Sequence, residues 1–365
     1  MLRPLSSLFL SPDVKLKLVR AGFQFTADLL HLSPPELSED SGVSQQEALE
    51  VLQAVKSVGG GPSLTALELL QKEEEFRSIV TFSAQLDHAL QGGFPAGKTT
   101  EVCGVPGVGK TQLCMQLAVD VQVPQCFGGV EGQVVFVDTE GSFLLQRVVD
   151  IATATVRHCS LLAEDAEQRV ALTTFSVESI LANIFLVRCH DYVELLAELH
   201  LLPDFLQDRP RVRLLVIDSV AFPFRRFDDL SQRTRLLHGI GQQLNTIAMR
   251  HHIAVATTNQ MTTRLRGSKP HLVPALGEGW GHTPTIRLLL QWKGSQRLAA
   301  IFKSPGHLDA SVQYQITTDG FRDADQSKQM QNKRTQTHTD QSASSLKKPA
   351  ADWSETFNQS EALCV

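Results

Sequence analysis

The feature that most constrains this chain is the segment Gly104-Val-Pro-Gly107-Val-Gly109-Lys110-Thr111, which fits the pattern G-x-x-x-x-G-K-[ST]. An apolar, β-rich run from Thr99 to Cys103 precedes it, and apolar residues at helical spacing follow it. A strand, a glycine-rich turn and a helix in this order leave backbone N–H groups pointing inward at a helix N-terminus, where they can surround a phosphate. The segment therefore predicts an α/β fold with a nucleoside triphosphate site.

The polar residues of the segment have separate roles in that chemistry. Lys110 can reach the β- and γ-phosphate oxygens, and the Thr111 hydroxyl can bind Mg²⁺. The glycines let the backbone approach the phosphates closely. We therefore expect the whole segment to contact the nucleotide: Gly104, Val105, Pro106, Gly107, Val108, Gly109, Lys110 and Thr111.

Acidic residues follow two further apolar strands. Leu214-Leu-Val-Ile217 leads directly into Asp218, and Val135-Phe-Val137 leads into Asp138 and Glu140. Ligand sites in open α/β sheets lie at the C-terminal ends of the strands. Beside the upstream loop, Asp218 is interpreted as a residue that orients the metal, although alone it would be an ordinary strand-end turn residue. A carboxylate of the other segment could activate water, and Asp138 is the weaker candidate of the two.

Composition and pattern divide the chain into four parts. Residues 1–58 contain short helical patterns separated by Gly and Pro, which predict a small all-helical, helix-hairpin-helix-like domain. Residues 59–78 begin with Gly-Gly-Gly-Pro-Ser and predict a linker. Residues 79–322 alternate apolar strands with helical stretches, so we expect an α/β core with a mostly parallel sheet and an antiparallel extension at one edge. Residues 323–365 are poor in aliphatic side chains and predict a disordered tail.

The bulk composition narrows the class of protein further. Hydrophobic residues make up 42 % of the 365 positions and charged residues 20 %, as in globular proteins. A net charge of -5 argues against a protein that coats nucleic acid by bulk electrostatics, so any DNA contact has to come from local basic segments. The 6 cysteines form no C-x-x-C pair, which argues against a zinc ribbon. No apolar run reaches the roughly 18 residues of a membrane span, and no membrane partner is expected.

In this order, the motifs resemble the eukaryotic branch of the RecA-like strand-exchange recombinase family, from the helical module to about Phe321. The family's order is kept by Phe94-Pro-Ala-Gly97, Gly128-Gly-Val-Glu-Gly132, Asp138-Thr-Glu-Gly-Ser-Phe143 and Thr258-Asn-Gln260. Four stretches are most similar to the C-paralogue branch, whose members assist homologous recombination within heteromeric complexes: Lys110 to Asp120, Asp191 to Leu196, Ala221 to Phe224 and Val273 to Gly277.

The resemblance implies a DNA-stimulated ATPase with a RecA-like core, ATP and Mg²⁺ as cofactors, and roles for three more positions. Glu140 matches the family's catalytic glutamate, and Gln260 matches the glutamine that senses the γ-phosphate; with Lys110 they form the implied catalytic set. Arg147 matches an arginine that packs near the adenine. From the residues alone, Gln260 ends a strand beside the nucleotide edge, and a capping amide stays an open alternative.

Two basic segments match the family's DNA loops, one from Phe222 to Arg235 and the other from Thr262 to His282. Basic side chains there can neutralise phosphates, and aromatic residues of the first segment could contact bases. A solvated charged face is the alternative for either segment alone. The contacts expected to single-stranded and branched DNA are made by Arg225, Arg226, Arg233, Arg235, Arg264, Arg266 and Lys269.

Two departures from the family pattern bear on its partners. The hinge reads Ser63-Leu-Thr-Ala-Leu67, without the aromatic residue that the family inserts into a neighbouring subunit. In Phe302-Lys303-Ser-Pro305 a lysine stands where the strand-exchange enzymes usually have aspartate, so we expect Lys303 to approach a nucleotide phosphate across a subunit interface. The expected partners are therefore other recombinase paralogues in a hetero-oligomer.

Other functions and locations stay open at this stage. The chain could instead be a non-catalytic assembly adaptor that uses ATP as a structural ligand, and a RecA-like helicase or unrelated P-loop ATPase is a third hypothesis. The resemblance implies a nuclear protein, with a cytoplasmic pool also open. A mitochondrial pool is open as well, since the first residues faintly resemble a mitochondrial presequence, although Pro4 and Pro12 would break its amphipathic helix.

Overall fold

The computed structural model describes residues 4–5, 8, 10–29, 32–58, 65–74, 76–225, 227, 229–266, 269–306 and 310–324. The chain divides into two compact units, Met1–Glu75 and Phe76–Val365. Within the segment predicted as a linker, helix α4 spans Ala66–Glu74. Asp323, the first residue of the predicted tail, is the last residue of strand β11, and the tail from residue 325 lies outside the described residues.

The first unit is a small helical module. Its helix starts follow local sequence: Ser33 precedes a proline at the first turn of α2 and forms a capping box with Glu36, and Gly42 ends that helix in the left-handed conformation. Apolar side chains of the helices between residues 12 and 58 meet in one buried cluster. The helices are α1 (Pro12–Arg20), η2 (Thr26–Leu29), α2 (Pro34–Ser41) and α3 (Gln45–Val58).

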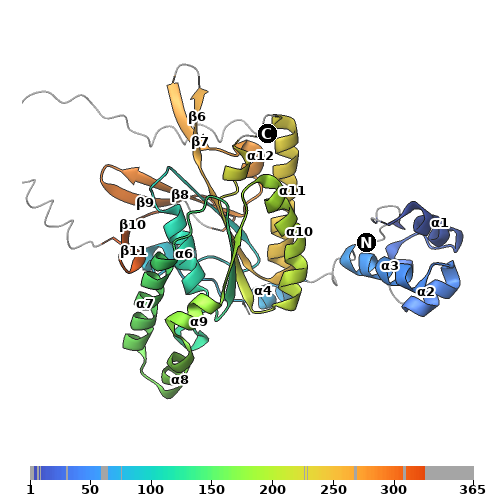
Figure 1. The fold of residues 1–365 in the computed structure, drawn as a ribbon, viewed down its shortest axis with the longest axis horizontal. Coiled ribbons are helices and arrows are strands. Elements are labelled where there is room, and N and C mark those ends of the chain that lie inside the picture. The colour runs from blue at the N-terminus through green and yellow to red at the C-terminus, as the bar shows by residue number, and fades with distance from the viewer. Residues whose placement is uncertain are drawn as a thin grey trace, which may run out of the picture. The chain divides into compact units, whose positions relative to one another are not determined.

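The second unit is an α/β core, and its described residues include a nine-stranded sheet in the order β11-β10-β9-β8-β1-β5-β4-β2-β3 (Figure 1). Strands β8, β1, β5, β4, β2 and β3 run parallel, and β9, β10 and β11 are added antiparallel at one edge. The predicted fold class and its antiparallel edge are confirmed. The strands are β1 (Thr99–Gly104), β2 (Gln133–Asp138), β3 (Ile184–Arg188), β4 (Val212–Asp218), β5 (Ala254–Asn259), β8 (Ile286–Lys293), β9 (Gln296–Lys303), β10 (Ala310–Thr317) and β11 (Gly320–Asp323).

Helices cover both faces of this sheet, which explains why its central strands are apolar throughout. In β2, Val134 and Phe136 belong to one buried cluster, and Val135 and Val137 to another, because successive side chains of a strand point to opposite faces. The first cluster packs against α5 (Ala84–Ala89), α6 (Lys110–Asp120), α7 (Leu145–Leu162), α8 (Ala166–Thr174) and α9 (Val177–Ala182). The second packs against α10 (Tyr192–Asp208), α11 (Leu230–His251) and α12 (Gly277–Gly281).

The two basic segments are more regular than their composition predicts. In the segment expected to be a second loop, β6 (Met261–Arg266) and β7 (Lys269–Pro274) pair as an antiparallel hairpin that stands out from the core (Figure 1). In the first segment a short turn of helix, η4 (Phe222–Phe224), is followed by α11, so Arg233 and Arg235 lie on a helix and not in a loop.

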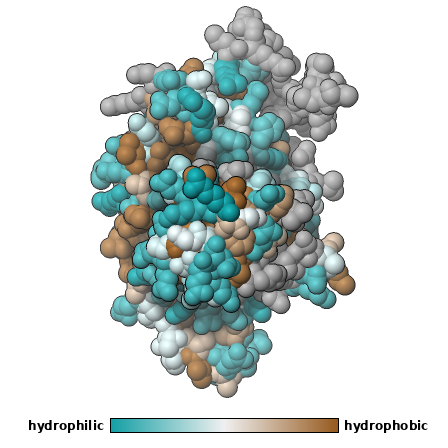
Figure 2. Space-filling view, turned by 90° about the vertical axis from the view of Figure 1, so that its right-hand side faces the viewer, coloured by the Kyte–Doolittle hydropathy of each residue, from teal (hydrophilic) through white to brown (hydrophobic). Residues whose placement is uncertain are grey.

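Hydrophilic residues cover most of the face seen in Figure 2, with smaller hydrophobic areas between them. Among the helices that the structure describes, none combines the length and the apolar character that crossing a membrane requires.

Candidate functional site

The phosphate-binding segment forms the turn between β1 and α6, as its pattern predicts. Gly109 precedes the first residue of α6 with a φ of 117°, a conformation that glycine adopts readily. Gly104 allows close packing, since a Cβ atom there would lie 2.6 Å from the carbonyl oxygen of Leu290 and 2.7 Å from a methyl carbon of Val108. The turn therefore needs glycine at Gly104 because space is short and at Gly109 because of its positive φ.

Lys110 folds back over this turn. Its Nζ donates to the carbonyl oxygens of Gly104, at 2.9 Å, and Val105, at 3.2 Å. Burial lowers the pKa of Lys110, while the nearby carboxylates of Asp218 and Glu140 act in the opposite direction. Because an ammonium group has three donor hydrogens, one remains for a phosphate oxygen.

Asp218 lies at the end of β4 and is 2 % exposed. Burial raises its pKa overall, although hydrogen bonds from the side chains of Thr111 and Thr258 act to lower it. Its Oδ2 atom is buried and has no well-formed hydrogen bond within the described part of the chain. A buried carboxylate oxygen beside a threonine hydroxyl fits a Mg²⁺ site, because this ion is commonly held by one or two protein groups together with water and phosphate.

Glu140 is held by two donors from neighbouring strand ends. Its Oε1 accepts a hydrogen bond from Ser219 Oγ at 2.7 Å and another from Gln260 Nε2 at 2.6 Å. Gln260 follows β5, so the contacts of Glu140 join the C-terminal ends of the parallel strands β2, β4 and β5. The structure thus brings Glu140 and Gln260 together, as expected from the sequence, and adds Ser219, which the motif analysis did not single out.

Asp138 has a different role from Glu140. Its carboxylate accepts hydrogen bonds from the backbone N–H groups of Glu140, Ser142 and Phe143 at 3.1 to 3.2 Å, and the residue is 1 % exposed. These bonds shape the turn that presents Glu140. The exposed Glu140 carboxylate is therefore the better placed of the two to act on a reacting water.

A protein-family model described as Rad51 matches residues 72–324 of this sequence. The chain belongs to the Rad51 family. It is 52 % identical over 340 residues to "DNA repair protein RAD51 homolog 3" of Cricetulus griseus, covering 89 % of this chain and 93 % of that protein. It is 41 % identical over 266 residues to the protein of the same name in Dictyostelium discoideum, covering 71 % and 69 %. It is 29 % identical over 323 residues to "DNA repair and recombination protein RadA" of Aeropyrum pernix, covering 86 % and 94 %. These findings confirm the resemblance to the C-paralogue branch.

Arg147, which the family resemblance places near the adenine, joins the nucleotide-binding helix to the edge of the sheet. Its Nε donates to Gln112 Oε1 at 2.7 Å, and its two terminal nitrogens donate to the carbonyl oxygens of Thr318 and Thr317 at 2.5 and 2.6 Å. Gln112 lies in the first turn of α6. A contact between Arg147 and adenine stays a prediction, and the described bonds fix the arginine beside the phosphate-binding helix.

Tyr314 bonds to the backbone of the turn between β1 and α6. The sequence analysis did not single it out. Its hydroxyl donates to the carbonyl oxygen of Val108 at 2.8 Å, and its ring stacks on Phe321 with centroids 4.5 Å apart. The residue is 2 % exposed, and burial raises the pKa of its phenol. Strand β10 carries it, 206 residues from Val108 in sequence, so only the folded sheet brings the two together.

Removing this hydroxyl should weaken nucleotide binding. In Tyr314→Phe the buried Val108 carbonyl loses its partner, which costs about 1 to 3 kcal/mol of stability in the loop. We expect a roughly 5-fold to 150-fold rise in the dissociation constant for a fluorescent ATP analogue, which is the equivalent of that cost borne by the bound conformation. Tyr192→Phe is the matched control, because these are the 2 tyrosines of the chain. Equal affinities of the two variants would contradict the assigned role.

The basic residues expected to contact DNA differ in their surroundings. Arg233 is half-buried and donates to the carbonyl oxygen of Ala275 at 3.4 Å, and Arg264 pairs with Glu278 at 3.5 Å. Arg235 is exposed on α11. Arg225 bonds to Gln260. Outside the description lie the whole of Arg226 and the side chains of Arg266 and Lys269. DNA binding by these seven positions stays a prediction.

Lys303 caps a short helix in this structure. Its Nζ donates to the carbonyl oxygens of Gly281, His282 and Pro284 at 2.7 to 3.1 Å, just after α12 ends. In the antiparallel register of β8 and β9, Lys303 lies opposite Arg287, near the start of β8. The turn between β1 and α6 instead follows the end of β1, which runs parallel to β8. Lys303 is therefore set back from the edge that carries its own chain's nucleotide loop, and a phosphate contact would have to come from another subunit.

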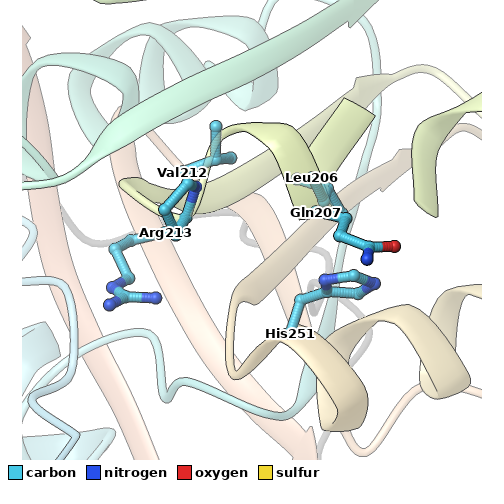
Figure 3. A pocket seen from close by; sticks show the side chains of 6 residues that line it. Leu206, Gln207, Val212, Arg213 and His251 are labelled. Atoms are coloured by element: carbon cyan, nitrogen blue, oxygen red, sulfur yellow. The ribbon is translucent and has the colours of Figure 1, made fainter. Parts of the chain in front are cut away.

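A cavity of about 220 Å³ lies beside the N-terminal end of β4, and Figure 3 shows the side chains that line it. Val212, the first residue of β4, lines it, whereas Asp218 ends the same strand. This cavity is therefore separate from the nucleotide edge. Its lining residues are Leu206, Gln207, Pro210, Val212, Arg213 and His251.

Proposed function

We propose that this chain is an ATP-binding and DNA-stimulated ATPase subunit of recombinase-paralogue complexes, acting in the nucleus in the recombinational repair of double-strand breaks and crosslinks. The observation that carries the proposal is the meeting of Lys110, Asp218 and the Glu140–Gln260 pair at one edge of the sheet. Rad51-family proteins are in general ATPases, and the similar proteins are named for DNA repair. Both facts support this assignment.

Each side chain would then act at a defined point of the reaction. Mg²⁺, held beside Thr111 and Asp218, would neutralise charge on the phosphates. Lys110 would stabilise the charge on the transferred phosphoryl group, and Glu140 would orient the attacking water. Gln260, which lies within hydrogen-bonding distance of Glu140, would report on the γ-phosphate. A phosphate contact of Lys303 on a neighbouring paralogue's nucleotide is part of the proposal.

A second function, an assembly adaptor with ATP as a structural ligand, is favoured by one observation. The same oxygen of Glu140 accepts two hydrogen bonds, from Ser219 and Gln260. The carboxylate therefore also has a structural role, because it links the residues that follow β4 and β5. In that case ATP would stabilise the core against unfolding, and turnover would be incidental.

The Glu140→Gln variant separates the two functions. We expect the full chain, purified with its bound partners, to keep ATP binding and partner binding but to lose about 10²-fold or more in hydrolysis with single-stranded DNA present, because an amide is a poor base. Glu164→Gln, at an exposed position before α8, is the matched control. Repair of crosslinks by cells carrying Glu140→Gln would favour the adaptor. An absence of hydrolysis by the unaltered assembly would refute the ATPase.

A further inference from the structure

A closed ring of contacts joins Glu140 to the first basic segment. Ser219 Oγ donates to Glu140 Oε1 and accepts from the backbone N–H of Phe222 at 3.1 Å. The guanidinium of Arg225 lies over the Phe222 ring, 5.0 Å from its centroid, and donates through Nε, at 2.9 Å, and Nη2 to Gln260 Oε1. Gln260 Nε2 closes the ring on Glu140. The segment that resembles a DNA loop is thus bonded directly to the nucleotide sensor.

The bond from Arg225 determines which end of the Gln260 amide faces Glu140. An amide has an acceptor oxygen and a donor nitrogen, and the two ends can exchange by rotation of the side chain. A guanidinium is a donor only, so it selects the oxygen and leaves Nε2 to donate to the Glu140 carboxylate. With the opposite orientation two acceptors would face each other. Arg225 therefore stabilises the one orientation in which Gln260 and Glu140 bond.

Arg225 is also able to bind a phosphate while it holds Gln260. It is exposed, and the guanidinium has five N–H donors, of which the two described bonds to Gln260 use two. Bonds between guanidinium and phosphate are charge-assisted and stronger than bonds to a neutral amide. A phosphate bound at this position would consequently change the position of the Arg225 guanidinium, the group that orients Gln260.

We propose that Arg225 is a positioning residue. It couples the binding of a single-stranded DNA phosphate to the orientation of the Gln260 amide, and through that amide to Glu140. The inference rests on the proposed function, in which Gln260 and Glu140 act on the nucleotide. It assigns Arg225 a role distinct from that of a plain phosphate contact. Arg235, exposed on α11 in the same basic segment, has the plain role.

The test measures coupling and does not need hydrolysis. The full chain with its bound partners is titrated against a fluorescein-labelled oligothymidylate, once with ADP and once with a non-hydrolysable ATP analogue, and fluorescence anisotropy gives two dissociation constants. Their ratio is the coupling between the nucleotide and DNA. We expect at least about 5-fold for the unaltered chain, in the usual range of allosteric coupling, and a ratio within about twofold of 1 for Arg225→Gln.

Two controls show whether Arg225 acts through Gln260. Arg235→Gln removes the same charge and should weaken both affinities equally, leaving the ratio unchanged. In a Gln260→Ala background, Arg225→Gln should change the ratio no further, because the partner is already gone. A ratio near 1 in the unaltered chain, or an unchanged ratio in Arg225→Gln, would overturn the proposal. Failure of the assembly to hydrolyse ATP would refute the proposed function and leave these binding ratios interpretable.

Discussion

Replacing Lys110 with alanine should reduce ATP hydrolysis by about 10²-fold to 10³-fold, the range seen when one preorganised donor to transition-state charge is lost. Lys110 is the cation of the loop, and two carbonyl oxygens of the loop hold its ammonium over the turn. Gly104 is buried, but Val105 is half-exposed and the next two residues are exposed, so water can replace the lysine at this turn and the fold should survive. The loss should therefore fall on nucleotide chemistry and not on folding.

Thermal unfolding separates these two effects. A ligand present at about 100 times its dissociation constant stabilises the folded state by about 2.7 kcal/mol, which raises the midpoint of unfolding. Without nucleotide, Lys110→Ala and the unaltered chain should unfold at the same temperature, and with ATP the variant's midpoint should rise less. Lys293→Ala, exposed at the end of β8, removes the same charge and should behave like the unaltered chain. Undiminished hydrolysis in Lys110→Ala would contradict the assignment of the nucleotide site.

Much of the core was predictable because its signals are local. A continuous apolar run such as Leu214 to Ile217 is buried on both faces, and only a sheet covered by helices on both sides provides that environment. The glycines of the nucleotide loop were found from their pattern, although the backbone that crowds Gly104 belongs to Leu290, far away in sequence. Asp218 and Glu140 follow buried strands directly, so their place at the sheet edge follows from the strand assignment.

The sequence analysis missed the hairpin β6–β7 and strand β11 for different reasons. Met261-Thr-Thr-Arg-Leu-Arg266 alternates only weakly, and its basic, glycine-containing surroundings favour a loop. Strand β11 is four residues long, too short for a pattern, and depends on contacts such as the N–H of Phe321 to Gln116 Oε1 at 3.0 Å. Such contacts span the whole domain and leave no trace in a local window.

Charge alone was a poor guide to the surroundings of the basic residues. Arg225 and Arg233 count equally in a basic segment, yet one bonds to the Gln260 amide and the other to a backbone carbonyl. Lys303 was interpreted from an exchange of sign, and the structure shows three carbonyl oxygens that a lysine satisfies and an aspartate would repel. Which partner a cation meets depends on the tertiary fold and cannot be read from its neighbours in sequence.

A buried carboxylate in β1, also missed from the sequence, joins the end of β5 to α12 and β8. Glu101 is 0 % exposed. Its Oε1 accepts from Trp280 Nε1 at 2.7 Å and Asn259 Nδ2 at 2.8 Å, and its Oε2 accepts from Arg287 Nε at 2.5 Å. Asn259 directly precedes Gln260, and Trp280 lies on α12. The Glu101 carboxylate thus links β1, which carries it, to β5, β8 and α12.

Removing this carboxylate should strongly destabilise the core. In Glu101→Ala the Arg287 guanidinium, 13 % exposed, and two neutral donors are left buried without their acceptor. Breaking a buried ion pair in this way costs about 3 to 5 kcal/mol, a large part of a domain's stability. Denaturant unfolding followed by tryptophan fluorescence measures it, because Trp280 on α12 and Trp292 on β8 report on the second unit.

The amide variant tests the explanation independently of the size of the loss. Glu101→Gln keeps an acceptor oxygen for Trp280 and Asn259 and loses only the charge facing Arg287, so it should cost less than Glu101→Ala. In an Arg287→Met background the same Glu101→Gln change should cost less again, because no buried cation is left unpaired. Glu164→Ala, at an exposed site, should leave the midpoint unchanged. If Glu101→Ala unfolded at the same denaturant concentration as Glu164→Ala, the carboxylate would not hold these elements together.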